Sequence, residues 1–346
     1  MEKDNEENKM NIDNDIETNK EIPMDEEKKI NAGKSQNNIP NTSLADLNVS
    51  MLTNYSMNSK NSDKSLKEDA VIIHPQKPNT DYLFNLEYFD EMYVNLLLDE
   101  KNSKFKINKN YMKECQNSIN VKMRGILVDW LIEIHSQFNL KRKTLFQTIY
   151  IIDLYLSYKA IEKNQFQLLG VASLFIASKM NEIYWPEIEK YVGISDNAFT
   201  IQELIKMELD IMKVIKFDIL APTAEEFFDI ISKTYEFNSE QHFLGDYILD
   251  SSLIEYNLLK FPPSIIGVST AYVVMKFFKL KGYKDLYLSE FSMIETEKKR
   301  KQTIKECAKN LCFLIKGLSS QTLFKSTIEK YSLEEFGKVA ELMGSK

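Results

Sequence analysis

The sequence predicts an all-α protein in which a polar tail and a single helix precede two successive sets of five helices. Three observations predict this class. Glycine and proline are scarce, at 10 and 8 of 346 residues, which favours long helices over turn-rich β structure. Apolar residues make up 43% of the chain, so hydrophobic cores can form. From residue 81 onward the apolar residues recur at helical spacing, and no segment is typical of a strand.

Residues 1–80 differ in composition from the rest of the chain. They hold 15 acidic residues, 10 lysines and 14 asparagines, but only one aromatic residue, Tyr55. Such a segment cannot bury enough apolar surface to offset its conformational entropy, so we predict a disordered tail. The tail is either a regulatory segment or a solvated linker, and its acidic start is not that of a signal peptide.

The folded part is predicted to open with one amphipathic helix from Asp81, in DYLFNLEYFDEMYVNLLL, and a loop to about Gln116. The first set of helices is predicted near 121–138, 143–158, 165–181, 185–193 and 201–215. Pro222, in the linker KFDILAPT, forbids continuation of the last helix. We therefore expect two domains, 81–219 and 220–346. The second set is predicted near 223–235, 240–257, 262–279, 285–293 and 300–315, with a last short helix near 332–342.

The helix MRGILVDWLIEIHSQF, residues 123–138, is apolar over roughly twice the width of an ordinary one-face stripe. Either it is buried all round, or one face lies in the core and another forms a groove for a partner. Arg124 lies among its apolar positions, where an unpaired buried charge costs about 3–5 kcal/mol. Asp153 falls inside the apolar stripe of the next helix, so we predict a structural ion pair between Arg124 and Asp153.

A second pair of opposite charges follows the same pattern. Lys179 ends the apolar face of one helix, and Glu208 interrupts the apolar stripe of another. We predict that they pair, either as a structural ion pair in the core or as a docking feature. The surrounding LFIASKMNEIYWPE favours docking, because it runs from a helix into an exposed aromatic turn with Pro186.

Several classes of function are not expected. The net charge of −7 gives no electrostatic reason for a nucleic-acid partner. Three cysteines without CxxC spacing indicate reduced thiols in an intracellular protein, and three scattered histidines indicate no metal site. No apolar run reaches the roughly 18 residues of a membrane span. No phosphate-binding loop, kinase signature or nucleophile elbow is present, so we expect no catalytic residues and no cofactor.

At these residues the sequence resembles the cyclin family, and within it the A/B (mitotic) group. MRGILVDWLIE is similar to that group's MRAILVDWLxE, with Gly125 replacing the alanine. The blocks QLLGVASLFIASKMNEIYWPE, TIQELIKMELDIMKVIKFDILAPTAEEF and FPPSIIGVSTAYVV resemble its later motifs. The five characteristic residues of the cyclin box are matched in order by Arg124, Asp153, Leu168, Lys179 and Glu208. The resemblance covers about residues 82–340 and implies two tandem five-helix cyclin boxes.

The resemblance also implies a function. A cyclin is a non-catalytic regulatory subunit that binds and activates a cyclin-dependent kinase, here in cell-cycle control around G2/M, in nucleus and cytoplasm. The kinase contacts that it implies are Lys179, Glu208, Ile176, Met180, Met212, Phe217 and Tyr88. Met180 and Asn181 depart from the family's usual FEE or YEE, which bears on the kinase subtype more than on the mode of docking, since methionine fills pockets adaptably.

The resemblance further implies a groove that captures Arg-x-Leu peptides of substrates or inhibitors. Its apolar stripe would be Met123, Ile126, Leu127 and Trp130, at spacing i, i+3, i+4 and i+7 on one helix face. Its other residues would be Glu133, Gln167, Ile194 and Asp196. The leucine of the peptide would enter the apolar part, and its arginine would meet Glu133 and Asp196.

Cyclin-fold transcription-associated factors are the alternative, either a transcriptional cyclin or a DNA-binding protein. DNA binding needs a basic face, whereas residues 81–346 carry 34 Lys and Arg against 36 Asp and Glu. The groove motif argues against a transcriptional cyclin. The basic run KKRK at 298–301 is either a nuclear localisation signal or a solvated helix end.

No degradation signal is identified in the tail, which holds neither arginine nor KEN. The RxxL matches at Arg124–Leu127 and Arg142–Leu145 lie inside predicted helices.

Overall fold

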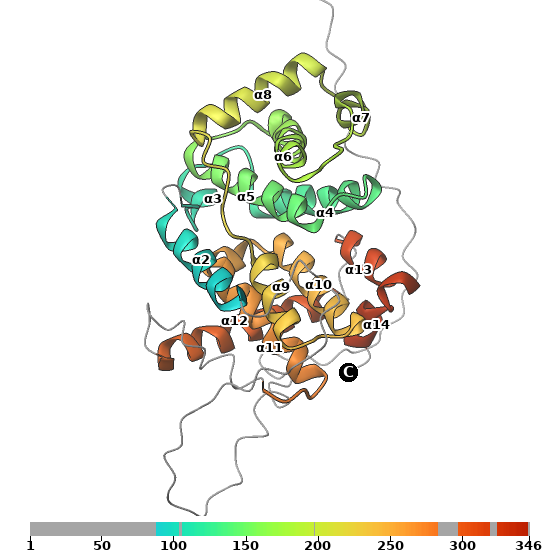
Figure 1. Ribbon diagram of the computed structural model, residues 1–346. Helices are drawn as coiled ribbons and strands as arrows, with labels where there is room; N and C mark the ends of the chain where they lie inside the picture. Colours follow the sequence, from blue (N-terminus) through green and yellow to red (C-terminus); the bar gives the residue numbers. More distant parts are fainter. Residues whose placement is uncertain (1–87, 104–105, 197, 283–296, 319–323, 345–346) are drawn as a thin grey trace, which may run out of the picture. The chain divides into compact units, whose positions relative to one another are not determined.

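The computed structural model describes residues 88–103, 106–196, 198–282, 297–318 and 324–344. The chain divides into two units, Met1–Pro75 and Gln76–Lys346, and all of these residues belong to the second unit. The tail predicted over 1–80 and the helix predicted near 285–293 lie outside the described residues. The described part is built from helices and contains no strand (Figure 1), which confirms the all-α prediction.

The helices follow one another in the two predicted sets. Two helices precede the first set, α2 (Phe89–Asn102) and α3 (Tyr111–Glu114). The first set is α4 (Val121–Gln137), α5 (Arg142–Tyr158), α6 (Phe166–Asn181), α7 (Ile188–Gly193) and α8 (Ile201–Val214). The second set comprises α9 (Ala224–Thr234), α10 (Ser239–Ile254), α11 (Pro263–Phe277) and α12 (Glu297–Leu318), followed by α13 (Ser326–Tyr331) and α14 (Val339–Gly344).

Some predicted boundaries are wrong, for local reasons. The single helix expected near 332–342 is not formed: α13 ends before this range, at Tyr331, and a 3₁₀ turn that ends at Gly337 with φ of +65° precedes α14. Glycine adopts this left-handed conformation without steric cost. α7 begins at Ile188 rather than near 185, because Pro186 disfavours helical backbone at the residue before it. α3 forms inside the segment expected to be a loop.

The helix starts follow from side chains that cap them. Three helices begin with a capping box, in which the first side chain and the side chain three residues later each accept a hydrogen bond from the other's backbone N–H. These pairs are Thr200 and Glu203 at α8, Thr223 and Glu226 at α9, and Asn238 and Gln241 at α10. α11 starts with Pro263 at its first position, where the missing N–H has no cost.

The buried apolar side chains form two clusters, one in each set of helices. The N-terminal helix α2 packs with the second cluster, although it precedes the first set in the sequence (Figure 1). Its apolar face consists of Phe89, Tyr93 and Leu97, and the Tyr93 ring meets that of Phe227 edge-on at 5.4 Å. Glu100 accepts hydrogen bonds from the backbone N–H and the hydroxyl of Ser264, at the start of α11.

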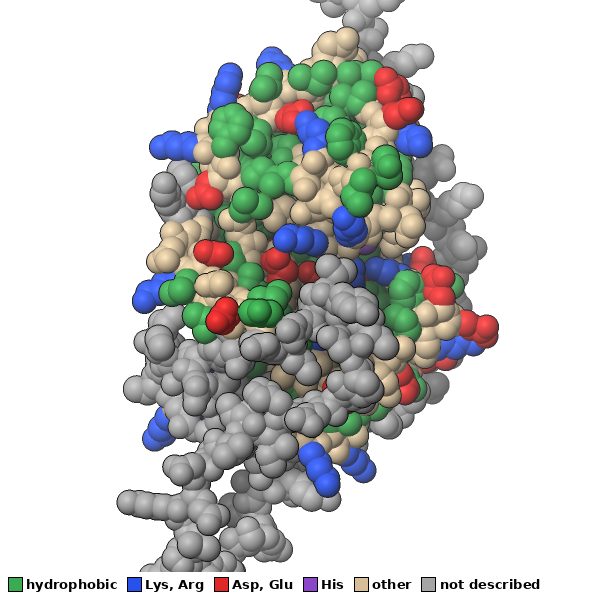
Figure 2. Space-filling view, viewed as in Figure 1, with side chains coloured by type: hydrophobic (Ala, Val, Ile, Leu, Met, Phe, Trp, Pro, Cys, Tyr) green, Lys and Arg blue, Asp and Glu red, His purple; other side chains and the backbone are tan. Residues whose placement is uncertain are grey.

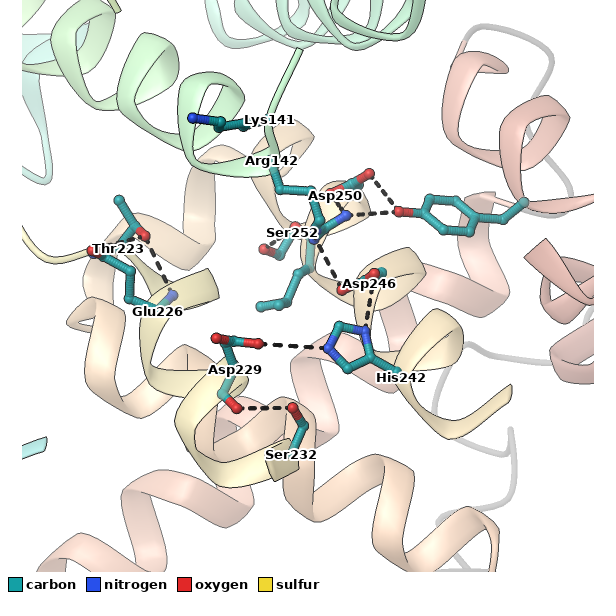
Figure 3. Close-up of polar contacts among 12 residues, drawn as sticks. Lys141, Arg142, Thr223, Glu226, Asp229, Ser232, His242, Asp246, Asp250 and Ser252 are labelled. Atoms are coloured by element: carbon teal, nitrogen blue, oxygen red, sulfur yellow. Dashed lines mark hydrogen bonds and ion pairs between the residues drawn. The ribbon is translucent and has the colours of Figure 1, made fainter. Parts of the chain in front are cut away.

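A buried polar network joins α5 of the first set to the second set (Figure 3). The Arg142 guanidinium lies 3.3 Å from the Asp246 carboxylate and 2.9 Å from that of Asp250, and it donates to the Tyr331 hydroxyl at 2.9 Å. Lys330 also pairs with Asp250, at 2.9 Å. Burial alone would raise the pKa of Asp250, but Arg142 and Lys330 outweigh burial and hold that pKa below its ordinary value.

His242 extends this network between two carboxylates. Its Nδ1 lies 3.3 Å from Asp246 and its Nε2 lies 3.8 Å from Asp229 (Figure 3). These two contacts raise the pKa of His242 to about 9, so the imidazolium is retained at neutral pH.

We expect His242→Gln to reduce the pH dependence of unfolding in alkaline solution. The folded-state pKa of His242 lies above its ordinary value of 6.5. Its stabilisation is therefore complete below that value and is lost as the pH rises through about 9. Glu225, whose pKa burial raises to about 7, titrates mostly below this window. The melting temperature of the wild type should fall more than that of the variant between about pH 8 and pH 9.5. An equal fall in both proteins would contradict the assignment.

Candidate functional site

The ion pair predicted between α4 and α5 is present and fully buried. Arg124 holds Asp153 through two parallel hydrogen bonds, Nε to Oδ1 at 2.7 Å and a terminal nitrogen to Oδ2 at 2.6 Å. The other terminal nitrogen donates to the carbonyls of Leu253 and Ile254, at 2.9 and 3.4 Å, where α10 ends and its carbonyls lack helical partners. The Tyr111 hydroxyl donates to Asp153 at 2.7 Å. The pair therefore joins α3, α4, α5 and α10.

We expect Arg124→Met to lower the free energy of unfolding by about 3–5 kcal/mol, because it leaves the Asp153 carboxylate buried without its cation. Asp153→Leu should also be destabilising, because it leaves the Arg124 guanidinium buried without its anion. The double variant should lose less than the sum of the two single losses, since it leaves no unpaired charge. Denaturant unfolding of the three variants measures this coupling, and strictly additive losses would contradict it.

Three of the four predicted stripe residues on α4 reach the surface. Ile126 is 44% exposed, and Met123 and Trp130 are half-buried. Leu127 is buried, because α6 approaches α4 closely at this point: a Cβ on Gly170 would lie only 2.8 Å from a Leu127 methyl carbon. Leu127 therefore contributes to the floor beneath the stripe rather than to its exposed edge.

The opposite side of α4 packs against the second set of helices. A Cβ on Gly125 would lie 2.9 Å from the Phe324 ring and 3.6 Å from an Ile254 methyl carbon, so the glycine makes room for that ring. One turn on, Asp129 accepts hydrogen bonds from the backbone N–H and the hydroxyl of Ser326, at 3.2 and 2.9 Å. α4 is thus not buried all round, because it packs against the second set and still exposes one apolar stripe. The use of that stripe as a partner groove stays a prediction.

The remaining predicted groove residues lie on α4, α6 and the end of α7. Glu133 is exposed, and its carboxylate accepts a hydrogen bond from Gln137 at 3.0 Å. Gln167 and Ile194 are half-buried. Asp196 is exposed on left-handed backbone, with φ of +54°. A carboxylate beside an apolar stripe, as Glu133 is one turn from Trp130 on α4, suits a peptide that carries one basic and one apolar side chain.

The second predicted pair, Lys179 and Glu208, is also formed. It joins the end of α6 to the middle of α8, and the side chains retain 32% and 20% of their exposure. The Lys179 ammonium lies 4.1 Å from the centroid of the Phe175 ring. This pair thus differs from the Arg124–Asp153 pair in being accessible from solvent.

The predicted apolar neighbours of this pair differ in exposure. Met180 is 38% and Phe217 is 70% exposed, and Met212 is half-buried. Phe217 projects from a linker in which it and Lys216 both have positive φ, at +60° and +50°, a conformation that is rare for bulky residues. Ile176, which the resemblance implied as a kinase contact, is only 3% exposed and packs in the core of the first set.

Tyr88 is 53% exposed and lies immediately before α2, the helix that packs with the second set. It is therefore carried by a different part of the fold from Lys179. Met92, one helical turn further along, is 42% exposed. The helical spacing of Tyr88 and Met92 could have shown that both share one face.

The structure also exposes apolar residues that the sequence analysis did not single out (Figure 2). On α8, Ile205 and Leu209 are 43% and 54% exposed, and Leu209 adjoins Glu208. In the turn after α6, which the sequence predicted to be aromatic and exposed, Ile183, Tyr184 and Trp185 are 75%, 92% and 49% exposed. Figure 2 shows hydrophobic side chains gathered over α6 and α8, toward the top of the view. The charged pair therefore lies within a largely apolar surface.

Two family models match the chain. One, for the cyclin N-terminal domain, matches residues 91–220, and the other, for the cyclin C-terminal domain, matches residues 222–345. Cyclin-A1-4 of Oryza sativa subsp. japonica is 34% identical over 262 residues, which cover 72% of this chain and 70% of the relative. The chain belongs to the cyclin family. The first helical set is its first cyclin box, and the second set is its second box.

Other cyclins support the same assignment. G2/mitotic-specific cyclin-B1 of Oryzias javanicus is 32% identical over 256 residues, which cover 74% of this chain and 62% of the relative. The chain thus spans less than two thirds of that cyclin's length. The X-ray structure of a viral cyclin from herpesvirus saimiri matches with a TM-score of 0.54 and 22% identity, covering 64% of this chain and 97% of the viral chain. This match concerns the fold, two tandem cyclin boxes.

The basic run KKRK is not a continuous basic patch in this cyclin. Lys298 and Lys299 are exposed at the start of α12, but Arg300 is 8% exposed and donates to the Tyr93 hydroxyl at 3.2 Å. A linear nuclear localisation signal would need Arg300 to leave this site.

Three further features bear on function. The two RxxL matches lie in α4 and α5, and both of their arginines are engaged in ion pairs. No helix among the described residues is long and apolar enough to cross a bilayer. Within the same residues, no cluster of His, Cys, Asp and Glu is arranged to hold a metal ion.

Proposed function

We propose that this cyclin is the regulatory, non-catalytic subunit of a cyclin-dependent protein kinase. The observation that carries the proposal is the Lys179–Glu208 pair, which remains partly exposed within an apolar surface. Large exposed apolar areas on a folded protein mark interaction sites. A charged pair inside such an area supplies orientation and specificity that apolar contact alone lacks.

The chemistry of the pair suits recognition of a polypeptide backbone. A lysine ammonium has three donors, and a carboxylate has several acceptor positions. Each group of the pair uses part of this capacity on the other and keeps part for a partner. The exposed side chains of Met180, Leu209 and Phe217 would bury apolar surface around that contact, at about 25 cal/mol per Å².

Activation follows if the partner surface exists only in the active kinase. In a protein kinase, a glutamate of the αC helix must pair with the ATP-binding lysine, and the activation loop must be ordered. A subunit that binds this arrangement more tightly than the inactive one shifts the population toward it. The cyclin then needs no catalytic group of its own.

We expect the full chain to form a stable complex with a monomeric cyclin-dependent kinase and to raise its histone phosphorylation strongly. Lys179→Ala/Glu208→Ala should raise the Kd by about tenfold or more, because it removes a charged contact at the centre of the interface. Co-elution and kinase assays measure both effects.

A matched control is available on the same helix. Lys159, at the end of α5, forms an ion pair with Asp210 of α8 at 2.7 Å. Their side chains are 46% and 34% exposed. Lys159→Ala/Asp210→Ala should leave the Kd close to that of the wild type. Equal weakening by both double variants, or a tight complex that is not activated, would contradict the proposal.

We also propose that the stripe on α4 and the nearby carboxylates recruit Arg-x-Leu segments of substrates or inhibitors. The support is the exposed apolar line of Met123, Ile126 and Trp130 beside Glu133. We place the action of the complex around G2 and mitosis, because relatives such as the cyclin-B1 of Oryzias javanicus are named G2/mitotic-specific.

We expect Trp130→Ala to weaken phosphorylation of protein substrates that carry an Arg-x-Leu segment, because it removes the largest apolar side chain of the groove. Phosphorylation of short peptides without the segment should be unchanged. Steady-state kinetics on the two substrate types measure the difference. A comparable loss on both types would refute the groove assignment.

A further inference from the structure

Lys179 has a second contact besides Glu208. Its ammonium lies 4.1 Å from the centroid of the Phe175 ring, a shorter distance than the 4.7 Å of Lys260 over Phe261. Phe175 precedes Lys179 by one helical turn on α6, and its ring is 7% exposed. A lysine ammonium over an aromatic face is attracted to the negative face of the ring, more strongly where the site is desolvated.

The Phe175 ring is itself held in place by neighbouring aromatic rings. It meets Tyr191 of α7 at a centroid distance of 5.1 Å and an interplanar angle of 63°. Tyr191 is fully buried, and its other side meets Phe138 at 5.4 Å. Rings packed at these distances and angles have favourable edge contacts. The face that Phe175 presents to Lys179 is therefore rigid.

A fixed ammonium is more useful for docking than a mobile one. A lysine side chain loses rotamer entropy when it is immobilised. If folding has already immobilised it, partner binding avoids that loss. Glu208 and the ring both engage the Lys179 ammonium, and because an ammonium has three donors, N–H capacity remains for a partner's acceptor.

We propose that Phe175 is the positioning residue of the Lys179–Glu208 docking pair. It holds the Lys179 ammonium in the binding geometry before the kinase arrives, and it does so through its ring face rather than by contact with the kinase. This inference rests on the proposed function and adds to it a buried residue that determines affinity.

The first test measures the Kd of the full chain for the kinase used in the reconstitution. Phe175→Leu keeps an apolar side chain but removes the ring face, and it should raise the Kd about three- to tenfold. Phe175→Tyr retains the face and should stay within about twofold of the wild type. Phe166→Leu is the matched control, because Phe166 is also buried on α6; it should leave the Kd unchanged.

A double-mutant cycle shows whether Phe175 acts through the lysine. In a Lys179→Met background, Phe175→Leu should add no further loss of affinity. A threefold or larger effect of Phe175→Leu in both backgrounds would overturn the proposal, since the ring would then act by packing alone. An unchanged Kd for Phe175→Leu in the wild-type background would also overturn it.

The second test needs no partner and so separates this inference from the proposed function. Acetylation of the free full chain with an amine-reactive reagent, followed by peptide mass spectrometry, gives the labelling rate of Lys179. Phe175→Leu should raise that rate several-fold, and Phe166→Leu should not. Equal rates in the wild type and Phe175→Leu would overturn the inference. A raised rate with no kinase bound by any variant would support the positioning role and refute the kinase partner.

Discussion

The buried contact between Arg124 and Asp153 is the constraint on which the other arrangements of the fold depend. A guanidinium taken out of water must have its N–H groups satisfied, and Arg124 reaches α5 with one side of its fork and the end of α10 with the other. This fixes the rotation of α4 about its axis. With that rotation set, Gly125 faces Phe324 of the second box, and Ile126 faces solvent. The exposed stripe is therefore a consequence of how the buried charge is satisfied.

Neither cyclin box is self-contained. α2 belongs to the N-terminal family match, yet its apolar side chains complete the core of the second box, and Glu100 caps α11. Asp129 on α4 likewise binds the first residue of α13. Hydrogen bonds and ion pairs cross between the boxes, so their relative orientation is set by hydrogen-bond directions as well as by apolar area. A surface that includes residues from α2 and from α8 depends on that orientation.

The fold class and both ion pairs could be predicted from the sequence, because each charge interrupts an apolar stripe of known period. The sequence could not show that α2 packs with the second set, since periodicity identifies an apolar face but not the residues that cover it. The same limit applies to Ile176 and Leu209, since both lie on amphipathic helices but the structure buries the first and exposes the second. The role proposed for Phe175 rests on the position of its ring relative to the lysine four residues away, which the sequence does not give. The break before α14 contains two successive left-handed residues, Gly337 and Lys338, a conformation that the pattern of apolar residues does not encode.

The network around Arg142 also limits how freely cyclin boxes can be exchanged. Arg142 is supplied by the first box, whereas the carboxylates of Asp246 and Asp250 that neutralise it are supplied by the second. A hybrid that joined this first box to a second box without acids at those positions would enclose a cation with no counterion. We consequently expect substitutions at these three sites to be coupled across the domain boundary, so that this first box and this second box form one electrostatic unit rather than interchangeable modules.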